Sequence, residues 1–267
     1  MRILRLDEVF DVEKPIIGVC HLKALPGAPF YEANFNAILE RALDDASKLE
    51  EGGVDGIIIE NYGDYPYLPV VKNPATISAM AIIVHEIIKE VSIPVGVSFL
   101  RNSAIASVGI AYVTGARFIR VNAYVENIST DSGIIQAAAP LILRYLRSLD
   151  GNLAILADIK VKHATPLGDY PILEIAKDAF ARGRASAIIV TGTRTGEPPN
   201  HQILLSLRES GIRPILIGSG LNPQNIKLLE YADGAIVGTY FKRDGITTNP
   251  VDMERVRKFI SMVKNFR

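Results

Sequence analysis

Eight short runs of mostly branched aliphatic residues recur along the chain, and longer segments with helical periodicity separate them. This alternation is typical of repeated strand and helix units built around a parallel sheet. Eight such units close into a (β/α)8 TIM barrel, which needs about 250 residues, and the chain has 267. The runs span residues 15–20, 55–60, 93–99, 117–122, 153–160, 187–191, 214–218 and 234–238.

The segments between the runs carry helix signals. Residues 36–51 have one continuous apolar stripe, as in a helix that packs on a sheet. Asn222 before Pro223 predicts a helix start leading toward Ala232, and Asp252 can cap a C-terminal helix. No linker or low-complexity tract divides residues 1–267, so we expect one domain. A doubly wound sheet competes with the barrel, but no glycine-rich dinucleotide turn follows the first run.

Charge and cysteine content exclude several classes of protein. The chain has 29 basic and 29 acidic side chains, so its overall field gives no reason to attract nucleic acid or an anionic membrane. The lone Cys20 cannot form an internal disulfide, which favours a reducing cytoplasm. No run approaches the roughly 20 apolar residues of a membrane-spanning helix. We expect a cytoplasmic protein without membrane insertion, and we leave open a homo-oligomer and a peripheral position on a membrane complex.

Polar residues gather where the predicted strands end. Ligands of TIM barrels bind at the C-terminal ends of the strands, so these residues are the candidates for a site. They are His21, Glu60, Arg101 and Asn122 after the first four runs and His163 after the fifth.

The fifth run places charge toward the inside of the barrel. Its apolar residues alternate with a second face, which consists of Leu156, Asp158, Lys160 and Lys162. Because the apolar face should pack against helices, we expect Asp158 and Lys160, and further along Lys162, to point toward the barrel axis or its mouth. Buried charges must be paired, so one interpretation is a structural ion network with Arg120.

The other interpretation of these charges is catalytic. Asp158 and Lys160 would transfer protons with help from Glu60 or His21, or a lysine would form a Schiff base. His21 and His163 could act as acid, base or metal ligand, or be hydrogen-bonded loop residues. Metal-assisted chemistry with Glu60 or Asp158 also stays open, although no metal-binding spacing and no motif for an organic cofactor occurs.

Small residues follow the last predicted strands. The loops after strands seven and eight form the recurring phosphate site of TIM barrels, and glycine lets backbone amides approach an oxyanion closely. The loop after the sixth run could close over such a ligand, with Arg194 as an anion clamp, and the tyrosine-rich stretch 61–67 could stack on it. The alternative is that the glycines only permit tight turns. The predicted phosphate-binding residues are Gly218, Ser219, Gly220, Gly238, Thr239, Thr191 and Gly192.

Several ordered strings resemble the BtpA family, which includes the SgcQ proteins. They include PIIGVCHLKALPGAP, GGVDGIIIENYGDYPY, FLRNSA, GARFIRVNAY, LADIKVKHATPL, VTGTRTGE, IGSGL and IVGTYFK, and together they cover nearly the whole chain. The resemblance implies a TIM barrel related to phosphate-binding barrels and a link to photosystem I biogenesis in cyanobacterial relatives. Ser103 after Arg101-Asn102, and the stretch 124–126, depart from the family pattern.

Two functions follow from these observations. The first is an enzyme that acts on a small phosphorylated metabolite, such as a phosphosugar or a nucleotide-like compound, by acid and base chemistry at the C-terminal face. The second is a noncatalytic assembly factor for a membrane complex, in which the barrel mouth binds a regulatory metabolite.

Overall fold

The computed structural model describes residues 1–194 and 196–267, and eight parallel strands form a closed barrel at its centre. Each strand pairs with the next along the chain, β5 pairs with β8, and β12 pairs with β2 to complete the ring. The expected (β/α)8 barrel is therefore confirmed, and each predicted run matches a strand to within two residues at either end. The strands are β2 (Ile16–His21), β3 (Gly56–Glu60), β4 (Val95–Ser98), β5 (Phe118–Val121), β8 (Asn152–Ile159), β10 (Ala187–Val190), β11 (Ile215–Ile217) and β12 (Ala235–Val237).

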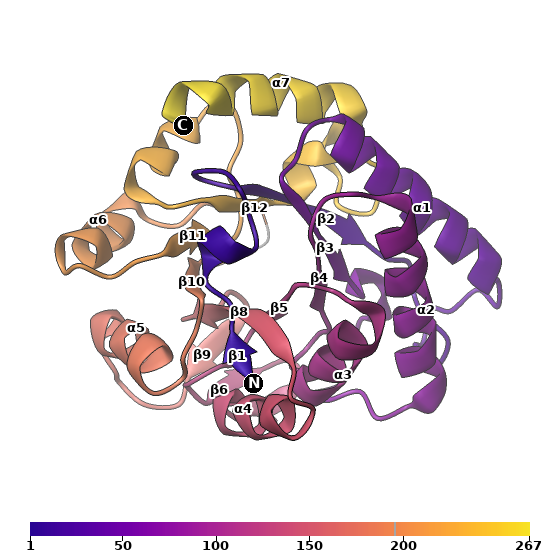
Figure 1. The fold of residues 1–267 in the computed structure, drawn as a ribbon, viewed down its shortest axis with the longest axis horizontal. Helices are drawn as coiled ribbons and strands as arrows, with labels where there is room; N and C mark the ends of the chain where they lie inside the picture. The colour runs from indigo at the N-terminus through magenta and orange to yellow at the C-terminus, as the bar shows by residue number, and fades with distance from the viewer. Residues whose placement is uncertain (195) are drawn as a thin grey trace.

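Helices surround the barrel as an outer ring (Figure 1). The expected helix over 36–51 is α1, which Asn34 caps by accepting a hydrogen bond from the backbone N–H of Ala37. Asp252 caps α7, as the sequence predicts, by accepting from the N–H groups of Glu254 and Arg255. The α-helices are α1 (Phe35–Glu51), α2 (Pro74–Glu90), α3 (Ala104–Thr114), α4 (Ala139–Ser148), α5 (Ile172–Ala181), α6 (His201–Glu209) and α7 (Met253–Val263).

The seventh unit differs from the expected helix. A 3-10 helix, η3 (Ile226–Tyr231), replaces an α-helix that would start at Pro223. Asn222 accepts a hydrogen bond from the N–H of Gln224, and the side chains of Asn222 and Asn225 both donate to the carbonyl of Gly220. These local hydrogen bonds hold the first residues in turns, so helical geometry begins later.

Short strands and 3-10 helices lie outside the eight barrel strands. A small antiparallel sheet of β6 (Ile128–Thr130), β7 (Gly133–Ile135) and β9 (Ala164–Pro166) extends from the segments that follow β5 and β8. Strand β1 (Arg2–Ile3) pairs with the start of β8, and η1 (Leu6–Glu8) follows it. The remaining 3-10 helices are η2 (Tyr62–Asp64), η4 (Thr239–Phe241), η5 (Arg243–Gly245) and η6 (Lys264–Phe266).

The core has two layers separated by the strands. Residues that point outward from the strands, such as Ile155, Ala157 and Ile159, pack with the helices. Inward residues such as Leu156 form a separate cluster inside the barrel. The alternation expected along the fifth barrel strand is thus confirmed as far as Ile159.

The N-terminal segment closes one end of the barrel. It crosses the centre of the ring in Figure 1, and Leu4, Leu6, Val9 and Phe10 join the inner cluster. The Phe10 ring lies 5.3 Å from that of Phe118, centroid to centroid. Because this apolar plug fills the N-terminal end, polar groups inside the barrel gather at the C-terminal mouth.

In the described part of the chain, none of the helices has both the length and the apolar character needed to cross a membrane.

Phe10→Ala should lower the free energy of unfolding by about 3–5 kcal/mol, because it leaves a cavity beneath Phe118. Val12, two residues along the same segment, is 39% exposed, and Val12→Ala should change stability by about 0.5 kcal/mol or less. Urea unfolding followed by circular dichroism measures both. Equal effects of the two substitutions would contradict a plug formed by Phe10.

Candidate functional site

A buried ion pair forms the floor of the barrel mouth. Arg120 of β5 donates two hydrogen bonds to Asp158 of β8, from Nε at 2.9 Å and from Nη2 at 3.0 Å. The side chains are only 5% and 0% exposed. Burial opposes the charge on Arg120, but the charge and hydrogen bonds of Asp158 outweigh burial and raise the pKa of the guanidinium. The structural ion network that the sequence allowed is therefore present.

Asn122 is the third member of this network. Its Nδ2 donates to Oδ2 of Asp158 at 2.7 Å, and this contact fixes which end of the amide faces the carboxylate. The other end, Oδ1, is buried without a hydrogen-bond partner. A buried acceptor with no partner is unfavourable, so this atom is ready to accept a hydrogen bond from a ligand. Asp158, with three donors around it, serves to hold Arg120 and Asn122 in place.

Glu60 and His21 lie side by side on neighbouring strands. They are register partners at the ends of β3 and β2, with 3.8 Å between Nε2 of His21 and Oε1 of Glu60. Ser98 of β4 donates to the other carboxylate oxygen of Glu60 at 2.9 Å. Both side chains are about nine-tenths buried.

His21 is a neutral imidazole at pH 7. Burial, followed by the positive charges of Lys242, Lys162 and Arg120, lowers its pKa well below the ordinary value of 6.5. The ring of Tyr62 packs edge-on against it, with 4.9 Å between centroids. Because it is neutral, His21 can exchange a hydrogen bond with a ligand without carrying a charge into the site.

Lys160 does not continue the inward face of β8, and the expectation that it would is wrong. The strand ends at Ile159, and Lys160 has a left-handed backbone with φ of 46°. Its N–H donates to Oε1 of Glu126, and its side chain is exposed. The alternation is lost at this residue because the chain changes direction there.

Lys162 lies at the barrel mouth, where the sequence placed it together with Lys160. Its backbone N–H donates to Oγ1 of Thr191, and its side chain lines the mouth of the barrel. Burial is the main cause that lowers its pKa, and the charge of Arg120 adds to it, so that the pKa falls to about 8. Glu60 and Asp158 act in the opposite direction. A lysine with this pKa can both give up and take a proton near neutral pH.

Arg101 supplies a further buried cation. It is 6% exposed, and its Nη2 donates to the carbonyl of His163 at 3.2 Å. Its guanidinium lies 6.0 Å from the ring centroid of Tyr67, while its buried Nε has no hydrogen-bond partner. The His163 side chain is exposed, and partial burial together with Lys162 and Arg101 lowers its pKa.

These residues enclose a cavity of about 240 Å³, which we call the inner cavity. Its walls bring together residues that the sequence singled out, namely Glu60, Arg101, Asn122 and His163, with the tyrosines of the stretch 61–67 that was expected to stack on a ligand. Leu100 and Asp131 had no predicted role. Ser98 was also missed, although it shares the inward face of its strand and alternation could have found it. The inner cavity is lined by Glu60, Tyr62, Tyr65, Tyr67, Leu100, Arg101, Arg120, Asn122, Asp131, Val161, Lys162 and His163.

The glycine loops after β11 and β12 lie outside the lining of the inner cavity. A Cβ at Gly220 would lie 2.2 Å from the backbone of Glu197 and Pro198, so this glycine admits the neighbouring loop. Ser219 donates to the carbonyl of Glu197 and accepts from the N–H of Gly192. These contacts agree with the alternative that Gly218, Ser219 and Gly220 permit a tight turn; they do not test phosphate binding.

The other predicted phosphate residues lie in two places. Gly238 approaches His21 so closely that a Cβ would be 2.8 Å from Cε1 of the ring, and Thr239 shares a hydrogen bond with Thr247. Thr191 and Gly192 line a separate cavity beside Lys160. Thr195, in the loop proposed as a lid, lies outside the described residues.

No group of three His, Cys, Asp or Glu side chains within residues 1–194 and 196–267 is arranged so that it could hold a metal ion.

Nuclear magnetic resonance of labelled lysine side chains should give Lys162 a pKa of about 8. Glu60→Gln should lower this pKa further, because the negative charge of Glu60 favours the protonated lysine. Glu174→Gln, which removes an exposed carboxylate on α5, is the control and should leave the Lys162 pKa unchanged. An ordinary lysine pKa, or one insensitive to Glu60, would contradict the geometry described here.

The same pKa makes stability depend on pH. The ordinary pKa of 10.5 for lysine exceeds the folded-state value of about 8, so the unfolded chain binds more protons between these pH values and stability should rise with pH. Lys162→Met should therefore stabilise the fold most below pH 8 and progressively less toward pH 10.5. Unfolding by urea across this range measures the difference, and an effect independent of pH would count against a buried charged Lys162.

Arg120→Met should cost about 3–5 kcal/mol of unfolding free energy, because it leaves the Asp158 carboxylate buried without its main partner. The double variant Arg120→Met/Asp158→Leu removes both charges and should recover most of that loss. Denaturant unfolding of the two variants measures the recovery. A double variant no more stable than the single one would contradict an unpaired Asp158 as the cause of the loss.

Curated relatives match almost the whole chain. A photosystem I biogenesis protein, BtpA, of Synechocystis is 42% identical over 257 residues, which cover 96% of this chain and 90% of that protein. An uncharacterised protein of Pyrococcus abyssi is 43% identical over 255 residues, covering 95% of this chain and 97% of that protein. A mitochondrial protein of Caenorhabditis elegans is 33% identical over 271 residues, with 98% of each chain covered.

Solved structures and the family model complete the comparison. The fold resembles N-(5'-phosphoribosyl)anthranilate isomerase of Pyrococcus furiosus, with a TM-score of 0.56 and 16% identity over 94% of this chain and 99% of that one. It also resembles 7,8-dihydropteroate synthase of Vibrio fischeri, with a TM-score of 0.59 and 15% identity over 99% and 98%. At these identities the likeness concerns the TIM-barrel fold alone. The BtpA family model matches residues 12–265, and the chain belongs to the BtpA family.

Proposed function

We propose that this protein is an enzyme that acts on a small phosphorylated metabolite by acid and base chemistry in the inner cavity. The observation that carries the proposal is the position of Lys162. Its pKa is lowered to about 8, and it lines one small cavity together with Glu60 and Arg101. Perturbed ionisable groups that converge in a cavity at the C-terminal mouth of a barrel are typical of catalytic sites.

The cations of the inner cavity are the groups that would bind the phosphate. Arg101 is buried and keeps one nitrogen, Nε, without a partner, and Lys162 faces the same space. Arg120 is already bound to Asp158 in a bidentate pair. It would therefore attract the phosphate through its positive potential rather than through direct hydrogen bonds. Charge-assisted hydrogen bonds from Arg101 and Lys162 to phosphate oxygens would be the strongest contacts of the complex.

The neutral part of the ligand would be read by Asn122. Its unpaired Oδ1 can only accept a hydrogen bond. The metabolite would therefore carry a donor, a hydroxyl or amine group, next to the phosphate-bearing part. Tyr67, whose hydroxyl is engaged with the carbonyl of Tyr62, presents an aromatic wall. A sugar phosphate or a nucleotide-like compound has both a phosphate and a hydroxyl or amine donor.

Proton transfer would fall to Lys162 and Glu60. The amine is near its pKa at neutral pH and can accept a proton from the substrate, while the Glu60 carboxylate stabilises the lysine cation that results. Asp158 would act as a positioning residue through Arg120 and Asn122. This assignment transfers to Lys162 the role that the sequence favoured for Lys160, because the Lys160 side chain lies outside the inner cavity.

A second candidate function is noncatalytic assistance in the assembly of a membrane complex. The name of the Synechocystis relative, which is 42% identical, is the observation that favours it. In that case the inner cavity would hold a regulatory metabolite, and binding without turnover would distinguish the two functions.

A thermal-shift screen with phosphorylated metabolites tests ligand binding. A metabolite at about 100 times its Kd should raise the melting temperature by about 5 °C. Arg101→Met and Lys162→Met should abolish the shift, whereas Lys177→Met, an exposed lysine of α5, should preserve it. If all variants retain the shift, the ligand binds outside the inner cavity.

With a substrate identified in this way, Lys162→Met and Glu60→Gln should each lower kcat by about a hundredfold or more, the usual contribution of a general acid or base. Lys160→Met distinguishes the two lysines and should lower kcat far less than Lys162→Met. Steady-state kinetics on folded variants supply the measurement. A larger loss in the Lys160 variant would return the proton transfer to Lys160, and full activity of both Lys162 and Glu60 variants would exclude the proposed chemistry.

A further inference from the structure

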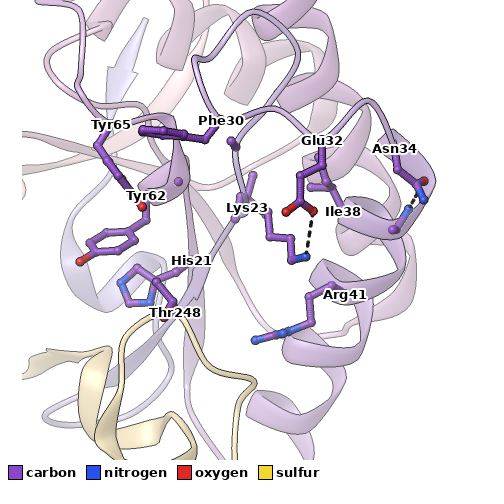
Figure 2. Close-up of a pocket in the computed structure, with 14 residues that line it drawn as sticks. His21, Lys23, Phe30, Glu32, Asn34, Ile38, Arg41, Tyr62, Tyr65 and Thr248 are labelled. Atoms are coloured by element: carbon purple, nitrogen blue, oxygen red, sulfur yellow. Dashed lines mark hydrogen bonds and ion pairs between the residues drawn. The ribbon is translucent and has the colours of Figure 1, made fainter.

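A second cavity of about 440 Å³ adjoins the inner cavity, and we call it the outer cavity. The segment between β2 and α1, the first turns of α1 and the residues around η2 enclose it, and Thr248 closes one side (Figure 2). Residues of the sequence that received no role on their own, such as Lys23 and Arg41, form part of its lining.

Two cations reach into the outer cavity from different elements. Figure 2 shows the side chains of Lys23, which follows β2, and Arg41, which belongs to α1, extending into the same space. Lys23 forms an ion pair with Glu32 at 3.4 Å, but the two side chains are 54% and 78% exposed. An exposed pair of this kind is weak, so Glu32 holds Lys23 only loosely.

Arg41 is anchored without being neutralised. Its Nε lies 3.2 Å from Oδ1 of Asp45, which is buried. The same carboxylate also accepts from Nζ of the fully buried Lys242 at 3.1 Å and from the N–H of Val251 at 2.7 Å. One carboxylate thus faces two cations, so it does not fully neutralise Arg41.

His21 adds a buried polar group to the same wall. Its side chain is 9% exposed, and its Nδ1 has no hydrogen-bond partner. A nitrogen left in this state costs free energy unless a ligand or water meets it. The outer cavity therefore combines two cations and the exposed Glu32 carboxylate with an unsatisfied and nearly buried imidazole.

The two cavities share part of their lining. Tyr62 and Tyr65 contribute to both, and His21 on the outer side lies 3.8 Å from Glu60 on the inner side. Phe30 and Tyr65, with ring centroids 5.3 Å apart, lie at the rim of the outer cavity. A single elongated molecule that reached both spaces would pass beside His21 and Glu60.

We propose that the outer cavity is a second oxyanion subsite, held by Lys23 and Arg41, so that the substrate carries an oxyanion group at each of its two ends and its reacting part beside His21 and Glu60. This inference rests on the proposed function for the role of the inner cavity. The second oxyanion is a carboxylate or a phosphate, since the guanidinium group recognises both through the same planar pair of donors.

Inorganic phosphate is a probe for both subsites. Titration followed by backbone amide resonances should shift Ala24 and Gly63, which line the outer cavity, and separately Arg101, which lines the inner cavity. Arg41→Gln and Lys23→Gln should each weaken binding at the Ala24 and Gly63 signals by about tenfold, the usual loss when one charge-assisted contact is removed. Lys162→Met should weaken binding at the Arg101 signal instead.

Arg182→Gln is the matched control, because Arg182 forms an ion pair with Asp178 at the same helical spacing as Arg41 with Asp45 and is 81% exposed. It should leave both titrations unchanged. Lys23 is exposed, so its variant should fold even if Arg41→Gln proves unstable. The subsite is overturned if phosphate does not shift Ala24 and Gly63, or if the Lys23 and Arg41 variants bind it there as the wild type does.

The two proposals fail separately. If phosphate shifts the Ala24 and Gly63 signals but not the Arg101 signal, the proposed function is contradicted and the outer oxyanion subsite is supported. The reverse result would leave an inner anion site and a substrate with only one anionic end.

Discussion

The bidentate pair between Arg120 and Asp158 is the contact on which the mouth of this barrel depends. Inside the barrel the layer below is apolar and closed by Phe10, so neither charge could stay buried alone. The carboxylate also fixes the Asn122 amide, which leaves Oδ1 buried and without a hydrogen-bond partner. The positive charge of Arg120 then helps to lower the pKa of both Lys162 and His21. One structural ion pair thereby sets the chemistry of several groups above it.

The sequence predicted the barrel and part of its floor for a common reason. Short aliphatic runs and the alternation within a strand are local properties; the runs located all eight strands, and the alternation correctly directed Asp158 inward. The alternation failed two residues later, at Lys160. This residue adopts a left-handed backbone, and its N–H donates to Glu126, which lies 34 residues earlier. No periodicity in the sequence reports such a contact. Both Lys160 and Lys162 were expected at the mouth, but only Lys162 lines the inner cavity.

The glycine loops and the outer cavity both depend on contacts between distant segments, which sequence patterns do not report. At Gly220 the backbone of Glu197 and Pro198 occupies the space next to the residue, a contact that the sequence did not indicate. The expected helix after Asn222 is a 3-10 helix because asparagine side chains compete for its first hydrogen bonds. Conversely, Lys23 and Arg41 carry no motif, and only the folding of α1 beside β2 brings them together. Sites built from single residues on distant elements become visible only in three dimensions.

A crystal structure with the phosphorylated metabolite that stabilises the protein most would test the central claim directly. That claim is that the inner cavity binds a small anion above the Arg120 and Asp158 pair. The account predicts phosphate oxygens within hydrogen-bonding distance of Lys162 and Arg101, and a hydroxyl or amine of the ligand on Oδ1 of Asn122. A ligand bound at the glycine loops or elsewhere, with the inner cavity empty, would contradict it.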